Sequence, residues 1–289
     1  MEKSSPTHLQ DTVLYLTHVS PSRNYLNVQV LNEVAAYLYD KLESYGCRVS
    51  YQEFDIGGKT YRNVIGSIGP EEGERIVIGA HYDVAGDQPG ADDNASAVAG
   101  LLESARILSL QEDQLKKRID FVAYTLEEPP FFGTDQMGSA IHAKSLRDAG
   151  VEVSFMVCYE MIGYFSDEPG SQQFPDPELA AHYPDTGNFI IVVGIDEYSE
   201  LVEDFYAKMK RHGKLPIERI SLSSPHGLAG MSDQRSYWSQ GYPAIMINDT
   251  SFLRNPHYHL PSDTIDTLDF DKMAEVVNGV NGAVWDSMD

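Results

Sequence analysis

A histidine and several carboxylates surround one predicted turn between a strand and a helix. A short apolar run at residues 76–78 follows Arg75 and predicts a strand. His81 and Asp83 come at the end of this strand, and their side chains point to the same face in extended backbone. Asp92 and Asp93 follow in a loop, directly before a segment with apolar residues at helical spacing. Because ligands of open α/β folds bind beyond the carboxyl ends of the strands, this stretch predicts half of a metal site.

Three later segments carry side chains of the same kinds directly after predicted strands. Glu127 and Glu128 follow one strand, Glu160 ends a second, and His257 and His259 come after a third. Taken singly, each group is more simply explained by a solvated strand end, helix capping or packing. Their shared position after four strands instead favours a single site that gathers them.

The mixture of carboxylates and imidazoles suits zinc, or else manganese or cobalt. Neither of the two cysteines belongs to these groups, which argues against a structural zinc cage. One carboxylate can bridge two such ions, with a water or hydroxide between them as the nucleophile.

Apolar periodicity predicts strands that alternate with helices along the chain. Strands are expected at residues 49–54, 60–68, 76–78, 118–125, 151–159, 189–193 and 244–247, and helices at 24–45, 95–108, 136–149, 197–212 and 270–285. Two glycines between the first two strands predict a hairpin. This alternation predicts an α/β fold, a three-layer α/β/α sandwich around a mixed, mostly parallel twisted sheet, with residues 1–289 as one domain.

The chain is strongly acidic, with 44 Asp and Glu against 21 Lys and Arg and a net charge of −23. This charge disfavours nucleic acid and anionic membranes as partners. No segment has the length of a transmembrane helix or the apolar core of a signal peptide. Cys47 and Cys158 each lie beside a predicted strand, which is typical of buried, reduced thiols. These features predict a cytoplasmic protein and leave its oligomeric state open.

Seven short motifs together resemble the dinuclear-zinc aminopeptidases. They are G-A-H-Y-D, G-A-D-D-N-A-S, Y-T-L-E-E, Y-E-M-I-G-Y, S-D-Q, G-Y-P-A and Y-H-L-P-S-D-T, which appear in family order over residues 63–266. The same superfamily includes glutamate carboxypeptidase, plasma glutamate carboxypeptidase, zinc-dependent glutaminyl cyclase and the inactive transferrin-receptor ectodomain. The resemblance implies the zinc-exopeptidase fold, two zinc ions and a peptide or aminoacyl substrate.

The resemblance also implies five metal ligands. His81 is similar to the histidine of the first zinc, and Asp93, rather than its neighbour, to the carboxylate that bridges the two ions. Glu128 matches a ligand glutamate, and Glu160 matches a position that is Asp in many members and Glu in others. His259 matches the histidine of the second zinc.

Three further residues resemble the catalytic machinery of the family. Glu127 matches the general base, and Asp83 matches the partner that orients the metal-binding imidazole of the first zinc. Tyr258 is similar to a tyrosine that stabilises the tetrahedral intermediate in some members. His257 has no counterpart and is interpreted as a pocket or surface residue. The family also implies a cis peptide bond after Asp93.

The sequence departs from the family pattern after Glu128. Nine residues, P-P-F-F-G-T-D-Q-M, precede Gly138 and Ser139, where the usual pattern is shorter. We expect this aromatic loop to line the pocket and to influence substrate preference. The S-D-Q that begins at Ser232 also departs from the commoner Ser-Asp-His.

The function expected from the resemblance is that of a metallo-exopeptidase, an aminopeptidase that hydrolyses the N-terminal peptide bond with a metal-bound hydroxide and Glu127 as general base. Glutaminyl cyclase chemistry, which needs one zinc, is an alternative on the same fold. A carboxypeptidase is another, but it needs a basic clamp, for which Arg235 and Arg254 are the nearby candidates. A non-catalytic binding protein is the alternative from a different class, and the filled ligand and base positions favour an enzyme over it.

Overall fold

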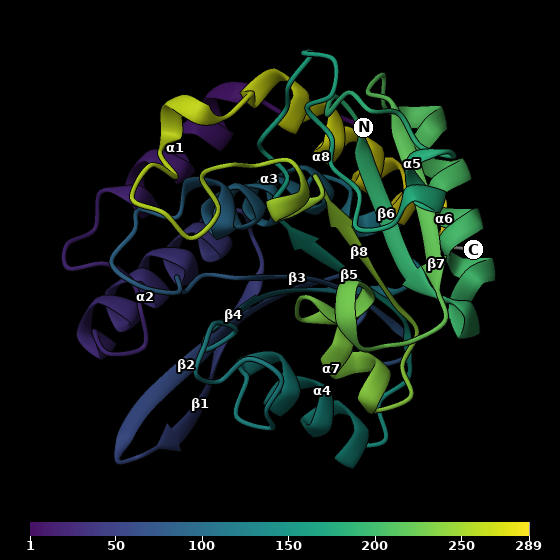
Figure 1. Cartoon of the computed structure of the whole chain (residues 1–289). Helices are drawn as coiled ribbons and strands as arrows, with labels where there is room; N and C mark the ends of the chain where they lie inside the picture. The colour runs from purple at the N-terminus through teal and green to yellow at the C-terminus, as the bar shows by residue number, and fades with distance from the viewer. Residues whose placement is uncertain (289) are drawn as a thin grey trace.

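The computed structural model describes residues 1–288, whose eight strands form one sheet (Figure 1). From one edge to the other, the strand order is β1 (Arg48–Ile56), β2 (Lys59–Ile68), β4 (Arg118–Tyr124), β3 (Arg75–His81), β5 (Val153–Glu160), β8 (Ala244–Asn248), β6 (Ile190–Ile195) and β7 (Ile217–Leu222). The predicted hairpin is confirmed, because β1 and β2 pair antiparallel.

The four central strands run parallel to one another. Strand β3 lies between β4 and β5, and β8 pairs with the other side of β5, all in parallel register. Strands β2 and β6 flank this group and pair antiparallel with β4 and β8. The sheet is therefore mixed and mostly parallel, as predicted, and its four central strands end at the same edge.

Helices cover both faces of the sheet (Figure 1). One face carries α1 (Pro6–Thr17), α2 (Val28–Ser44), α3 (Ala97–Ser109), α6 (Ser199–His212) and α8 (Phe270–Trp285), and the other carries α4 (Gly138–Asp148) and α7 (Gln234–Ser239). Alternate residues of a central strand enter different cores: Ile76 and Ile78 belong to the larger core, and Val77 to the smaller. This two-sided burial explains why the central strands are continuous apolar runs.

Three of these elements, α1, β7 and α7, were not predicted from the sequence. Helix α1 is capped by Ser5, whose hydroxyl accepts from the amide of His8, and it begins with Pro6, both standard signals for a helix start. Strand β7 is an edge strand, where Glu218 and Arg219 interrupt the apolar pattern. Helix α7 has six residues, too few for a clear period. The long segment between β5 and β6 contains one short helix, α5 (Pro177–Ala180).

Both cysteines, Cys47 and Cys158, are buried and free, as predicted. Within residues 1–288, no helix combines the length and the apolar character needed to span a membrane.

Candidate functional site

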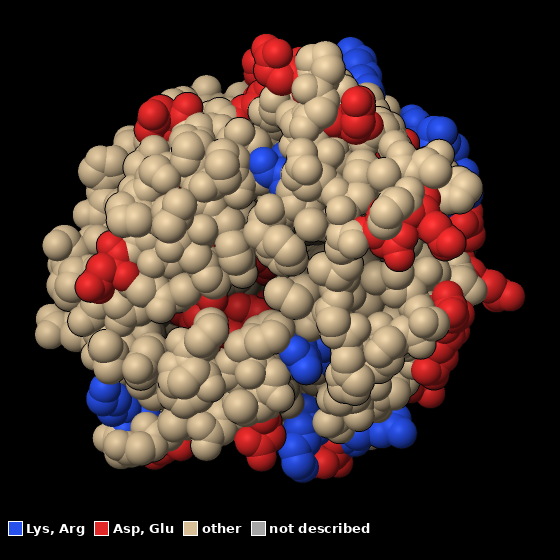
Figure 2. Space-filling model, in the orientation of Figure 1, with Lys and Arg blue, Asp and Glu red and all other residues tan. Residues whose placement is uncertain are grey.

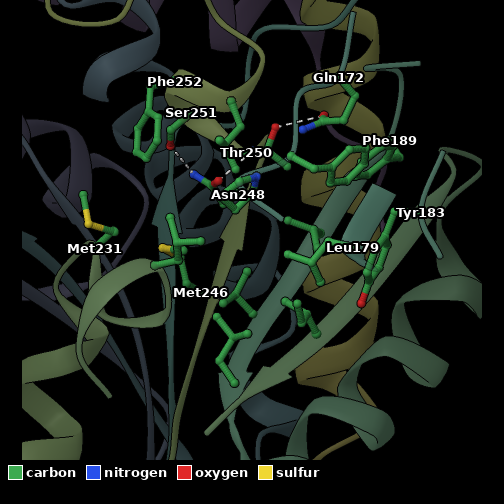
Figure 3. A pocket seen from close by; sticks show the side chains of 18 residues that line it. Gln172, Leu179, Tyr183, Phe189, Met231, Met246, Asn248, Thr250, Ser251 and Phe252 are labelled. Atoms are coloured by element: carbon green, nitrogen blue, oxygen red, sulfur yellow. Dashed lines mark hydrogen bonds between the residues drawn. The ribbon is translucent and has the colours of Figure 1, made fainter. Parts of the chain in front are cut away.

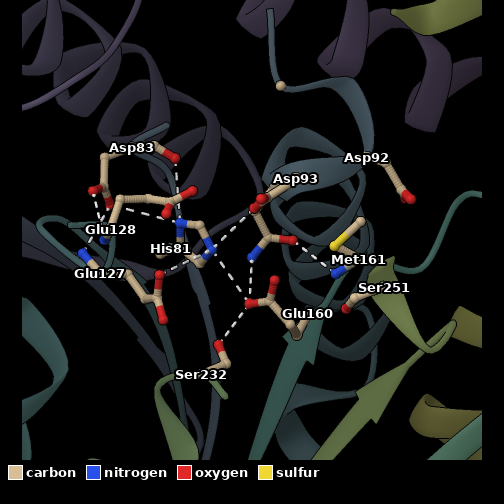
Figure 4. Close-up of polar contacts among 12 residues, drawn as sticks. His81, Asp83, Asp92, Asp93, Glu127, Glu128, Glu160, Met161, Ser232 and Ser251 are labelled. Atoms are coloured by element: carbon tan, nitrogen blue, oxygen red, sulfur yellow. Dashed lines mark hydrogen bonds and ion pairs between the residues drawn. The ribbon is translucent and has the colours of Figure 1, made fainter. Parts of the chain in front are cut away.

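An acidic hollow opens at the edge of the sheet where the four central strands end (Figure 2). The pocket at this position has a volume of about 130 Å³. Its lining combines carboxylates and an imidazole with apolar and aromatic side chains: Asp93, Glu127, Glu128, Pro129, Phe132, Glu160, Met231, Tyr258 and His259. His81 lies at the centre of this cluster, between Glu127 on one side and Glu160 and Asp93 on the other (Figure 4).

Two groups of three possible ligands share one aspartate. Ligand atoms of His81, Asp93 and Glu160 lie within 4.8 Å of one another, and so do those of Asp93, Glu128 and His259. The two oxygens of Asp93 face different histidines: Oδ1 lies 3.5 Å from Nε2 of His81, and Oδ2 lies 3.0 Å from Nε2 of His259. This arrangement is the geometry of a carboxylate placed between two cation positions.

The turn before α3 holds Asp93 in this orientation. The carboxylate of Asp263 accepts hydrogen bonds from the backbone amides of Asp92, at 2.9 Å, and Asp93, at 3.1 Å. The Asp93–Asn94 peptide bond is cis, as the resemblance implied. The Asp92 side chain points away from the cluster (Figure 4) and accepts from the amide of Gly163, so the choice of Asp93 over Asp92 agrees with the geometry.

Asp83 connects the end of β3 to the turn after β4. Its two carboxylate oxygens accept hydrogen bonds from the backbone amides of Glu127 and Glu128, both at 3.1 Å. The Nδ1 atom of His81 lies 3.2 Å from the Asp83 carbonyl oxygen and 3.6 Å from its Oδ1. Asp83 therefore lies beside the imidazole, and it also holds the backbone amides of both glutamates, a contact that the sequence did not indicate.

Glu160 is held by two side chains that the sequence analysis did not single out. The hydroxyl of Ser232 donates to its Oε2 at 2.5 Å, and the amide of Asn94 donates to the same oxygen at 3.2 Å. Ser232 belongs to the S-D-Q motif, and this motif was the sequence signal that could have identified it as a site residue.

Burial of so many carboxylates changes their proton affinity. Burial, together with the neighbouring Glu128 and Glu160, raises the pKa of Glu127 well above its usual value. Burial and the charge of Asp93 raise the pKa of Glu128 to about 8. Burial lowers the pKa of His259, but contacts with Asp93 and Glu128 outweigh it and raise that pKa to about 10. The cluster therefore favours bound positive charge, which protons or metal cations supply.

Several buried atoms of the cluster have no hydrogen-bond partner among residues 1–288, although they are of the kinds that bind a divalent cation. Glu127 Oε1, Glu128 Oε1 and His259 Nε2 are buried and make no hydrogen bond, although His259 Nε2 lies 3.3 Å from Glu128 Oε1. Buried polar atoms normally have hydrogen-bond partners. Buried atoms that lie close together without such bonds therefore indicate a binding partner that all of them share. Carboxylate oxygen and imidazole nitrogen are ligands of zinc, and the residues present fit that ion.

The two histidines of the H-Y-H segment have different surroundings. The Nδ1 atom of His257 lies 3.0 Å from the hydroxyl of Ser262, and this residue is in none of the possible ligand groups within residues 1–288. Tyr258 stacks on His259, with ring centroids 3.8 Å apart. Tyr258 also lines the pocket, and burial raises its pKa, so its phenol stays protonated and can donate a hydrogen bond.

The aromatic loop after Glu128 contributes to the pocket in part. Pro129 and Phe132 line the pocket, as expected of this loop. Phe131 instead packs its ring edge against Tyr25, with centroids 5.5 Å apart. The guanidinium of Arg235 lies over the ring of Phe132, 4.7 Å from its centroid.

An apolar cavity of about 100 Å³ adjoins the acidic pocket. Met231 lines both spaces, and the cavity continues past Met246 toward Leu179 and Phe189 (Figure 3). Its lining comes mainly from strands β6, β7 and β8 and from the loop before β6.

Arg254, one of two candidate basic clamps, is committed elsewhere. It is buried, and it donates to the carbonyl of Phe189 at 2.8 Å and to the side-chain oxygen of Gln172 at 3.0 Å. These bonds use Nε and Nη1 and hold the loop before β6, while Nη2 is buried without a partner among the described residues, and Arg254 does not line the acidic pocket.

Comparison with known sequences identifies relatives over most of the chain. The model of peptidase family M28 matches residues 63–284. A protein of Escherichia coli K12 described as uncharacterized protein YfbL is 45% identical, over 98% of this chain and 89% of its own length. Probable leucine aminopeptidase 1 of Trichophyton verrucosum is 28% identical, over 77% of this chain and 57% of its own length. The chain thus spans little more than half of that longer relative.

Two solved structures share the fold at low sequence identity. The zinc aminopeptidase BSAP of Bacillus subtilis has a TM-score of 0.76 at 14% identity, covering 98% of this chain and 95% of its own. The glutaminyl cyclase of Bacteroides thetaiotaomicron, bound to N-acetylhistamine, has a TM-score of 0.75 at 21% identity, covering 99% of each chain. The arrangement of sheet and helices is therefore common to a peptidase and a cyclase.

Proposed function

The chain belongs to peptidase family M28, and on that premise we propose that it is a zinc-dependent aminopeptidase that uses two metal ions. The observation that carries the proposal is the orientation of Asp93, whose two oxygens face His81 and His259 separately. The leucine aminopeptidases among the relatives and the zinc aminopeptidase among the similar structures support the same activity.

The two ligand groups would hold one ion each. The first ion would be held by His81, Asp93 and Glu160, and the second by Asp93, Glu128 and His259. Zinc bound there would polarise the scissile carbonyl and lower the pKa of the attacking water.

Glu127 is the proposed general base. Its Oε1 is buried, unpartnered and part of the pocket wall, so it can receive the proton of the attacking water. Burial raises the pKa of Glu127, which makes its carboxylate a stronger base toward that proton, and the protonated group can then return the proton to the leaving amine. Tyr258 would donate its phenolic hydrogen to the carbonyl oxygen as negative charge develops there.

The apolar cavity is the proposed site of the substrate's N-terminal side chain. It adjoins the acidic pocket at Met231, which lines both. The lining favours leucine, methionine or phenylalanine side chains over charged ones, because a charge would be desolvated there without a partner.

Glutaminyl cyclase activity is the second candidate, favoured by the structural likeness to a cyclase. The complete second group of ligands, around Glu128 and His259, favours the peptidase. A carboxypeptidase is less well supported, since Arg254 is bonded within the protein and Arg235 lines a separate groove instead of the acidic pocket.

The test is hydrolysis by the zinc-loaded protein of leucine 4-nitroanilide, its N-acetylated form and a peptide with N-terminal glutamine. The proposal expects cleavage of the free aminoacyl substrate and none of the acetylated one. Cyclisation of the glutaminyl peptide without cleavage of the anilide would instead establish the cyclase.

A further inference from the structure

Arg235 is one of only 21 basic residues in a chain of net charge −23. Among residues 1–288, no Asp or Glu makes an ion pair with it, whereas most arginines of the chain have one. Its Nη1 donates to the carbonyl of Gly230 at 3.2 Å, and its guanidinium lies over the ring of Phe132. Arginine has five N–H groups, so most of its donor capacity is left for a ligand.

A groove of about 500 Å³, lined by both apolar and charged side chains, opens beside Arg235. The groove runs between the loop at residues 133–137, helix α4 and helix α7, and its charged lining residues are Asp135, Lys144, Glu197, His226 and Arg235. Lys144 is already paired with Asp148. Figure 2 shows basic side chains beside the acidic hollow, on the side of α7. Arg235 is therefore the basic residue of the groove that is free to bind an anionic ligand.

A single aromatic ring separates this groove from the proposed catalytic pocket. Phe132 lines the pocket, and the guanidinium that covers its ring, 4.7 Å from the centroid, lines the groove. One extended residue spans about 3.5 Å, so the one or two residues that follow the scissile bond are long enough to pass a single aromatic ring. Since the apolar cavity adjoins the pocket at Met231, the groove beyond Phe132 would take the part of a substrate that follows the scissile bond.

We propose that Arg235 binds the C-terminal carboxylate of a short peptide that lies in this groove, so that the protein prefers dipeptides and tripeptides with a free C-terminus. The inference rests on the proposed aminopeptidase function and adds a specificity residue to it. The planar guanidinium matches a carboxylate with two parallel hydrogen bonds, and it offsets the repulsion that a peptide carboxylate meets near an acidic cluster.

The test compares leucyl-glycine and leucyl-glycyl-glycine with their C-terminal amides, using the zinc-loaded parent, Arg235→Met and Arg235→Lys. Methionine keeps an apolar side chain over Phe132 without the charge. The parent should show a kcat/KM about 10- to 100-fold higher for the free acids than for the amides, mainly through KM. Arg235→Met should bring that ratio close to one, and Arg235→Lys should retain part of it.

The matched control is Arg147→Met. Arg147 also lacks a carboxylate partner among the described residues and lies over an aromatic ring, that of Tyr242, but it lines a different cavity. This variant should keep the parent's ratio of acid to amide. Equal rates for acids and amides in the parent, or an unchanged ratio in Arg235→Met, would overturn the inference while leaving the aminopeptidase intact. Failure of the parent to cleave any of the peptides or leucine 4-nitroanilide would overturn both.

Discussion

The carboxylate of Asp83 accepts a hydrogen bond from the backbone amide of Glu127 at 3.1 Å. A residue at the end of β3 thereby fixes the turn that follows β4, and with it the side chain proposed as the general base. The same carboxylate holds the amide of Glu128, so one aspartate positions both a proposed base and a proposed ligand.

Asp83→Asn tests this positioning role. Asparagine keeps the size of the side chain, but its NH₂ group cannot accept from a backbone amide, so one of the two glutamate amides loses its partner. We expect zinc affinity and kcat each to fall about 10- to 100-fold, as is typical when a group behind a metal ligand is removed. Zinc titration and steady-state kinetics measure the two effects. Asp11→Asn, at an exposed position of α1, is the control and should match the parent. Parent-like zinc affinity and kcat in Asp83→Asn would contradict the role.

Substitution of the two histidines near the C-terminal end of the site should have different effects on metal content. His259→Ala should remove one zinc per chain, because its Nε2 faces Asp93 and Glu128. His257→Ala should retain both ions, since its ring contacts Ser262 instead. Zinc stoichiometry by atomic emission after dialysis distinguishes them. Loss of zinc from His257→Ala alone would place the ligand two residues earlier in the chain.

The buried His142 should make the protein less stable in mild acid. Burial lowers the pKa of His142 to about 4 in the folded protein, below its usual value near 6.5 in an unfolded chain. As pH falls from about 6.5 to 4, the unfolded chain takes up a proton that the folded protein does not, so stability decreases. The contribution reaches about 3 kcal/mol at the lower end of this window.

His142→Gln isolates that contribution, because glutamine can still accept from the hydroxyl of Tyr237, which lies 2.7 Å from His142 Nδ1. The free energy of unfolding in urea should change less between pH 7 and pH 4 in this variant than in the parent, by about 3 kcal/mol. His182→Gln, at an exposed position, should keep the parent's dependence. Identical pH dependence in the parent and His142→Gln would contradict the assignment.

The part of the site that follows from strand direction could be predicted from sequence. His81, Glu128 and Glu160 each come at or just after the end of an apolar run, and β3, β4 and β5 are parallel, so their carboxyl ends had to meet. The same reasoning predicted the central sheet, because buried strands are continuous apolar runs. Short or edge elements such as α7 and β7 carry too little apolar pattern for such a prediction.

The supporting contacts could not be predicted, because they join residues far apart in the chain. Ser232 lies 72 positions from Glu160, and Asp263 lies 170 from Asp93, so the motifs that contain Ser232 and Asp263 do not indicate which residues they contact. The two arginines illustrate the same limit. Arg254 and Arg235 are equivalent as basic residues in a sequence, and only the fold buries the first among carbonyl groups while leaving the second beside a groove.

Glu127 and Glu128 are adjacent in sequence but have different proposed functions: Glu127 is the general base, and Glu128 is a metal ligand. The most direct measurement is zinc stoichiometry together with steady-state kinetics on leucine 4-nitroanilide for the parent, Glu127→Gln and Glu128→Gln. Glutamine keeps the shape of Glu127 but cannot take the water's proton. We expect two zinc ions per chain in the parent and in Glu127→Gln, with kcat lowered about 10²- to 10⁴-fold in that variant and KM changed much less. Glu128→Gln should bind zinc more weakly and recover part of its activity in excess zinc. Turnover of Glu127→Gln at the rate of the parent would contradict the account.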